Sequence, residues 1–112
     1  MLYTSVALFA LAAVAGFIVI RAVWQKKETP KAAVFAHGTL AALGLVLLVV
    51  YALQNPQNFP QLSLILFVAA ALGGFYLFAR DMRKSVVPVS VAAIHALIAV
   101  SGFVVLLLFV FG

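Results

Sequence analysis

The chain of 112 residues contains no cysteine and few charged residues. Without a thiol it can form no disulfide, thiolate metal site or iron–sulfur cluster, and it lacks the attachment point of a covalent c-type haem. Only 8% of the residues are charged, whereas a water-soluble domain has about a quarter. Since 68% of the residues are apolar, so short a chain cannot bury that apolar surface within itself. The composition therefore excludes a water-soluble globular domain.

The chain has instead four long apolar runs, at about residues 2–24, 32–53, 61–79 and 88–111. Each is about as long as the 20 helical residues that cross the apolar core of a bilayer. None alternates between apolar and polar residues as the strands of a membrane barrel do. Because the connections are short, successive helices run antiparallel. The sequence predicts an all-α fold, an integral membrane four-helix up-down-up-down bundle that forms one transmembrane domain over residues 1–112.

All the charged side chains flank the first and third connections of this bundle. The seven cations are Arg21, Lys26, Lys27, Lys31, Arg80, Arg83 and Lys84. The second connection, residues 54–60, has no charge. Because Lys and Arg accumulate in cytoplasmic loops, the first and third connections are expected in the cytoplasm and both termini outside it. The expected location is the inner membrane of a bacterium.

The sequence also repeats itself at an offset of 58 residues. When residues 1–54 are aligned with 59–112 without gaps, 14 positions are identical, and about five would be expected by chance. The shared pattern is Ser-x2-Leu-Phe-x2-Ala-Ala-x2-Gly-Phe followed by Pro-x6-His-x6-Gly. Each repeat contains two helices, so two tandem helical hairpins are expected, related by an axis along the membrane normal.

The two histidines of the chain are equivalent under this repeat. His37 and His95 each follow a proline by seven residues, so both are expected about two helical turns inside the cytoplasmic face. Their helices are diagonal partners in an up-down-up-down bundle, which lets the imidazoles face each other with a large planar group between them. An ionisable side chain inside a membrane is costly, and for that reason it indicates a functional site.

Small residues surround the expected histidine layer. Gly44 and Gly102 lie seven residues beyond the histidines, on the same helix faces. Gly16 and Gly74 end Ala-x3-Gly pairs on the flanking helices, at a similar depth. Such pairs commonly serve helix packing. Next to the histidines they would also let a flat macrocycle approach the backbone.

Paired histidines on two transmembrane helices, with glycines on the same faces, resemble the membrane b-type cytochromes. In that class two imidazoles hold a non-covalent haem inside a four-helix bundle. The resemblance concerns the architecture and the His and Gly pattern, and it implies that His37 and His95 are the axial ligands of the haem iron. It also implies that Gly44 and Gly102 pack against the ring. Many members hold two haems through four ligands, whereas this chain has ligands for one.

The function implied by this resemblance is one-electron transfer by haem b near the cytoplasmic side. Arg21 and Arg80 would pair with the haem propionates at that interface. The expected partners are the lipid bilayer and either a quinone or a redox partner protein, a homodimer is compatible, and nucleic acid is not expected. No catalytic residues are identified, and the expected role is that of an electron-transfer protein or of an oxidoreductase subunit.

Other classes of function stay open. A haem-free structural or assembly subunit of a membrane complex would need only helix packing and hydrogen-bonded neutral histidines. The chain is similar in size and helix number to the small multidrug-resistance exporters. Those transporters need a carboxylate inside the membrane, and Glu28 and Asp81 both fall in connections. A zinc ion usually takes four ligands, and no carboxylate or thiol is expected at the depth of the histidines.

Overall fold

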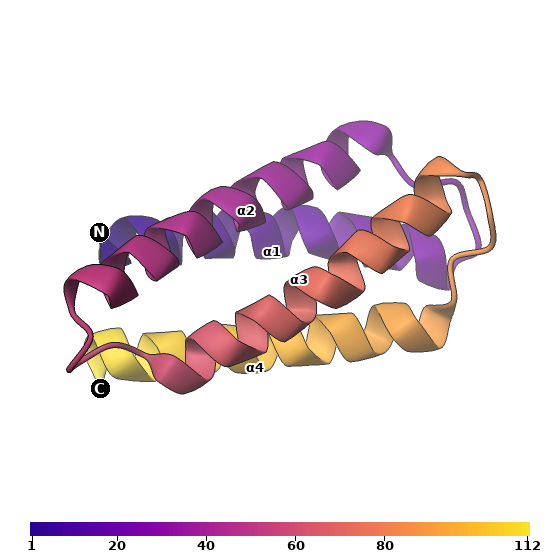
Figure 1. Ribbon diagram of the computed structural model, residues 1–112. Coiled ribbons are helices and arrows are strands. Elements are labelled where there is room, and N and C mark those ends of the chain that lie inside the picture. Colours follow the sequence, from indigo (N-terminus) through magenta and orange to yellow (C-terminus); the bar gives the residue numbers. More distant parts are fainter.

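The computed structural model describes all 112 residues, Met1–Gly112, as four helices without a strand. The helices are α1 (Leu2–Trp24), α2 (Lys31–Gln54), α3 (Gln61–Met82) and α4 (Val89–Phe111). Both termini and the α2–α3 connection lie at one end of the molecule, and the other two connections lie at the opposite end (Figure 1). The predicted all-α, up-down-up-down four-helix fold is therefore confirmed.

Each of the four helices is long and apolar enough to cross a membrane. The bundle is 44 Å long and 22 Å wide, and a bilayer with its headgroups is about 40–45 Å thick. Large apolar side chains such as Leu11, Val46 and Leu72 are exposed on the outside of the bundle. Water would disfavour such a surface, whereas lipid tails solvate it. The chain thus has the character of an integral membrane protein.

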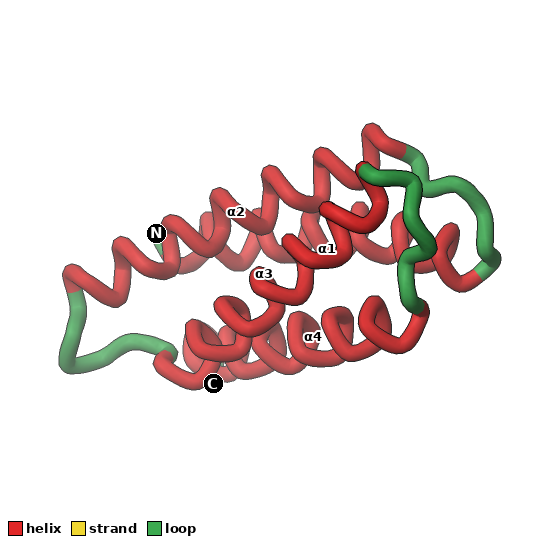
Figure 2. Tube along the Cα trace, turned by 45° about the vertical axis from the view of Figure 1, so that its right-hand side comes forward, coloured by secondary structure: helices red, strands yellow, loops and turns green.

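The four helices form two tight hairpins. α1 packs along α2 and α3 along α4, while the hairpins meet through the less extensive α1–α4 and α2–α3 contacts. The backbones of α2 and α4 do not come as close as those of neighbouring helices, and α1 and α3 lie between them in both views (Figure 1 and Figure 2). α2 and α4, which carry the histidines, are therefore diagonal partners.

The buried core consists of two repeat-related pairs, Phe9 with Phe67 and Leu48 with Leu106. The phenyl rings of Phe9 and Phe67 are stacked, with centroids 3.9 Å apart and planes at 4°. Because these two residues are equivalent under the 58-residue offset, the axis that relates the hairpins passes between their rings. The side chains of Leu48 and Leu106 are fully buried.

The prediction that the third helix ends at residue 79 was wrong by three residues. α3 continues to Met82, so Arg80 and Asp81 lie in its last turn rather than in the connection. The apolar run ends where the lipid ends, but the backbone can keep its helical hydrogen bonds in the aqueous layer beyond. A cation such as Arg80 is also favourable there because it faces the negative end of the helix dipole. At the other helices the bounds differ by at most one residue.

α1 and α3 end in the same backbone motif. Lys26 and Lys84 adopt left-handed conformations, with φ of 56° and 55°. The next amide in each case, of Lys27 or Ser85, donates to a carbonyl five residues earlier, at 2.9 and 3.0 Å. This is the Schellman motif, in which glycine usually occupies the left-handed position. The two lysines are 58 residues apart, so the helix ends follow the repeat as well.

Candidate functional site

His37 and His95 come together in the interior of the bundle. Their ring centroids are 6.1 Å apart, and the ring planes are at 85°. Both side chains are half-buried. The two residues are at equivalent positions of the repeat, on diagonal helices. In the structure their rings lie next to each other.

One nitrogen of each imidazole is anchored to the backbone of the neighbouring helix. Nδ1 of His37 lies 2.8 Å from the carbonyl oxygen of Ala12, and Nδ1 of His95 lies 2.7 Å from that of Ala70. A carbonyl oxygen can only accept, so Nδ1 carries the hydrogen and donates it. In the neutral ring Nε2 is then left with a lone pair. Neither Nε2 atom hydrogen-bonds to the protein.

Gly16 and Gly74 make these anchors possible. A Cβ at Gly16 would lie 2.9 Å from Cε1 and Nδ1 of His37, and one at Gly74 would lie 3.1 Å from Cε1 of His95. Residue 16 stands one helical turn after Ala12, on the side of the Ala12 carbonyl. A side chain there would block the path of the imidazole to that carbonyl. Each Ala-x3-Gly pair is therefore the slot that receives a histidine.

Gly44 and Gly102 lie in a different layer of the bundle, and the structure does not bring them to the histidine rings. A Cβ at Gly44 would lie 3.2 Å from the ring of Phe9. At Gly102 it would lie 3.3 Å from Leu66 and 3.4 Å from the ring of Phe67. These glycines accommodate the stacked phenyl rings, because two turns along α2 or α4 the facing side chain is a phenylalanine of the same hairpin.

Two buried serines add a second hydrogen bond to each hairpin. Ser5 Oγ donates to the carbonyl of Gly44 at 2.9 Å, and Ser63 Oγ donates to the carbonyl of Gly102 at 2.8 Å. Both side chains are completely buried. Together with the histidine anchors, each hairpin therefore has two polar contacts between its helices, at matching positions.

Arg21 and Arg80 are not directed at the histidine pair. Nη2 and Nε of Arg80 donate to the carbonyl of Val86 at 2.8 and 3.1 Å, and its Cζ lies 5.9 Å from the centre of the Tyr76 ring. Arg21 is exposed on α1 and lines a shallow surface hollow with Trp24. Arg80 thus has partners within its own hairpin.

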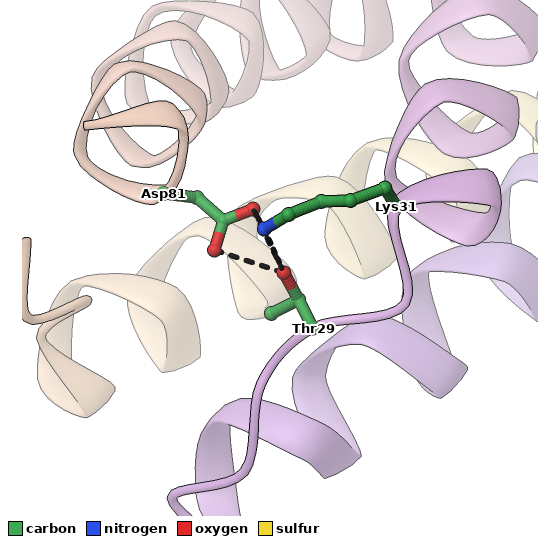
Figure 3. Close-up of polar contacts among 3 residues, drawn as sticks. All are labelled: Thr29, Lys31 and Asp81. Atoms are coloured by element: carbon green, nitrogen blue, oxygen red, sulfur yellow. Dashed lines mark hydrogen bonds and ion pairs between the residues drawn. The ribbon is translucent and has the colours of Figure 1, made fainter. Parts of the chain in front are cut away.

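Thr29, Lys31 and Asp81 form a polar cluster that joins α3 to the start of α2 and to the connection before it (Figure 3). Nζ of Lys31 is 2.9 Å from Asp81 Oδ2, and Thr29 Oγ1 is 2.9 and 2.8 Å from the two carboxylate oxygens. Lys31 also donates to Thr29 Oγ1 at 2.9 Å. Sequence reasoning missed this cluster, because Asp81 is 50 residues or more from Lys31 and Thr29 along the chain and was expected in a connection. The repeat offers a signal, since the three equivalent positions are all valine.

Comparisons of the chain with protein-family models, with curated proteins and with solved structures find no match. The histidine pair and its surroundings are therefore the features of the chain that bear on its function. No group of three or more His, Cys, Asp or Glu side chains is arranged to hold a metal ion.

Proposed function

We propose that the chain binds one b-type haem between His37 and His95 and transfers single electrons. The observation that carries the proposal is the separation of the two imidazoles. A metal–imidazole bond of about 2 Å, with about 1 Å more from nitrogen to ring centre, would put two rings on opposite sides of one metal atom roughly 6 Å apart. The observed centroid separation of 6.1 Å has this value.

The anchoring of the rings also suits ligation. A metal-binding histidine almost always donates its other ring N–H to a carbonyl or carboxylate, which fixes the tautomer and makes the ligating nitrogen more basic. Here the carbonyls of Ala12 and Ala70 receive the Nδ1 hydrogens. The Nε2 lone pairs of His37 and His95 are then the atoms available for a ligand.

The small number of donors favours a macrocycle over a bare ion. His37 and His95 have no third His, Cys, Asp or Glu beside them, and a protein-bound zinc ion usually takes four ligands. A haem iron needs only two axial ligands from the protein, because the porphyrin supplies the other four nitrogens. The site therefore fits a haem better than a zinc ion.

A flat ring could enter if the two hairpins move apart and then close again, which returns the imidazoles to the separation of about 6 Å that ligation needs. His37 is anchored to α1 of its own hairpin, and His95 is anchored to α3 of the other. The hairpins can thus separate as units while both imidazoles keep their hydrogen bonds. The contacts that must yield are the α1–α4 and α2–α3 contacts, which are less extensive than those inside a hairpin, and the stack of Phe9 on Phe67.

A haem with two histidine ligands supplies one-electron redox chemistry without an open position on the iron. The chain's own residues hold the two ligands in the Ala12–Gly16 and Ala70–Gly74 slots. Lys31, at the start of α2, is six residues before His37, or about 9 Å along the helix axis. The site thus lies near the end of the bundle that carries the basic residues. By the positive-inside rule that end is cytoplasmic, with both termini outside the cytoplasm, which suits the inner membrane of a bacterium.

The test is an absorption spectrum of protein purified in detergent from cells supplied with haem. We expect a Soret band and sharp α and β bands after reduction, and their loss in His95→Ala. Gly38→Ala is the matched control, because a Cβ at Gly38 meets no atom within 4 Å. Colourless wild-type protein that takes up no added haemin would refute the proposal and favour a haem-free structural or assembly subunit.

A further inference from the structure

The two hairpins are joined to each other by a single polar cluster. The side-chain hydrogen bonds of Ser5 and His37 connect α1 to α2, and those of Ser63 and His95 connect α3 to α4. Only the cluster of Thr29, Lys31 and Asp81 makes side-chain hydrogen bonds from one hairpin to the other. The hairpins also meet through the stacked rings of Phe9 and Phe67 and through the His37–His95 pair.

The contact between α2 and α3 is here called the α2–α3 seam. The cluster lies at this seam, between the histidine pair and the nearer end of the bundle. Lys31 is six residues before His37 on α2. Asp81 is seven residues after Gly74 on α3, which puts both on one face, and Gly74 contacts His95. Figure 3 shows the carboxylate of Asp81 reaching from α3 to the side chains at the start of α2. The cluster therefore lies about two helical turns beyond the histidines.

The repeat makes this seam different from its counterpart. At the offset of 58 residues, Asp81 corresponds to Val23, Thr29 to Val87, and Lys31 to Val89. The α1–α4 seam thus has only valines where the α2–α3 seam has an ion pair and a hydroxyl. Val23 is buried although it lies next to the end of α1. The two seams therefore differ in the polarity of the residues that close them.

The charged groups of an ion pair at an aqueous boundary separate at a low cost in free energy, because water then hydrates each of them. The side chain of Lys31 is 39% exposed, whereas that of Asp81 is 14% exposed and Thr29 is 7% exposed. Water therefore reaches the ammonium group first. A valine seam has no such exchange, since its apolar groups gain nothing from water.

We propose that the α2–α3 seam is the route by which a planar ligand reaches the histidine pair, and that the Thr29–Lys31–Asp81 cluster is its latch. When the latch opens, the carboxylate and the ammonium group become hydrated and the hairpins part at this end. The histidines keep their Nδ1 anchors, because those bonds lie inside the hairpins. The identity of the ligand rests on the proposed haem function, whereas the opening of the seam does not.

Spin labels can measure the opening directly, because the chain has no cysteine of its own. Ala32→Cys with Met82→Cys puts two labels at exposed positions on either side of the α2–α3 seam. The repeat-equivalent pair, Trp24→Cys with Ser90→Cys, is also exposed and flanks the α1–α4 seam. We expect Asp81→Asn to lengthen the distances of the first pair only. Unchanged distances in the first pair, or equal lengthening in both pairs, would overturn the latch.

Access to the site is measured on the two histidines themselves. Diethyl pyrocarbonate modifies the free imidazole nitrogen, and peptide mass spectrometry resolves the two sites. Loss of one charge-assisted contact is expected to raise the modification rate of His37 and His95 about tenfold in Asp81→Asn. The triple variant T29V/K31V/D81V copies the valine seam, and we expect it to react more slowly than wild type. Equal rates in all three proteins would overturn the route.

Haemin uptake separates this inference from the proposed function. If the seam is the route for haem, uptake should be faster in Asp81→Asn and slower in the triple valine variant, in parallel with the modification rates. If no variant binds haemin while both the label distances and the modification rates respond, the haem proposal fails and the latch stands. If haemin binds at one rate in all variants, the haem proposal stands and the latch fails.

Discussion

Gly16 is the position where adding a single methyl group should damage the histidine site most. The Cβ of Gly16→Ala would lie 2.9 Å from two atoms of the His37 ring. The ring must move, and its hydrogen bond to Ala12 is lost or lengthened. Forcing extra atoms into a packed interior typically costs about 1–3 kcal/mol, and loss of the hydrogen bond costs about 0.5–1.5 kcal/mol. Alanine regains about 1 kcal/mol of helix propensity, so we expect net destabilisation by about 0.5–3.5 kcal/mol.

Three other glycines of the chain form a graded series of controls. At Gly74 the closest atom of His95 would be 3.1 Å from the new Cβ, so the loss should be smaller than at Gly16. At Gly73 the closest distance is 3.8 Å, which is ordinary contact, and at Gly38 nothing lies within 4 Å. Gly38→Ala should therefore stabilise the helix by up to about 1 kcal/mol.

The assay is unfolding of the detergent-solubilised protein by added sodium dodecyl sulfate, followed by circular dichroism. The fluorescence of Trp24, the single tryptophan, gives an independent signal. We expect the order of stability Gly38→Ala, wild type, Gly74→Ala, Gly16→Ala. A Gly16→Ala protein as stable as Gly38→Ala would refute the argument that the glycine exists to admit the imidazole.

Two further predictions use the same assay. Ser5→Ala and Ser63→Ala each remove a buried hydrogen bond between helices, and each should destabilise the protein by about 0.6–1.7 kcal/mol; no effect at either position would mean that the bond contributes nothing. Lys26 and Lys84 adopt a left-handed backbone conformation, which costs a residue with a side chain about 1–2 kcal/mol. Lys26→Gly and Lys84→Gly would remove this cost. Glycine loses about 0.5–1 kcal/mol of that gain to chain entropy, so each variant should be more stable by about 0.5–1 kcal/mol, and a loss of stability would contradict the assignment of the helix end.

The helices could be predicted from the sequence because membrane spans are a property of composition and length. Four runs of apolar residues determine four helices, and short connections determine their directions. The end of α3 was missed because hydropathy reports the edge of the lipid and not the end of the hydrogen-bonded backbone. Arg80 and Asp81 are charged, yet they continue the helix.

The histidine pair could be predicted only in part. The repeat made His37 and His95 equivalent, which led to the expectation that they face each other. In the structure their ring centroids are 6.1 Å apart. Their anchors could not be predicted, since the acceptors are backbone carbonyls of Ala12 and Ala70, and a carbonyl leaves no mark in the sequence. For the same reason, the sequence did not predict that Gly16 admits the imidazole of His37. It showed only a spacing of small residues that is common in helix packing.

Local sequence patterns could not predict the cluster at the α2–α3 seam. Lys31 and Asp81 are 50 residues apart, and only the packing of α2 against α3 brings them together. Charge counting assigned Lys31 to membrane topology and Asp81 to a connection, which leaves no reason to pair them. A comparison of the two repeats would have marked these positions, because the equivalents are Val89 and Val23.

The most direct test of the central claim is a haemin titration of wild type, His37→Ala and His95→Ala in detergent, read by absorption and by electron paramagnetic resonance. We predict one haem per wild-type chain with the low-spin spectrum of two imidazole ligands. Each single variant should lose that spectrum, and added imidazole should restore it by filling the vacant ligand position. Low-spin haem that is bound equally well by wild type and both variants, or the absence of bound haem in the wild type, would contradict the account.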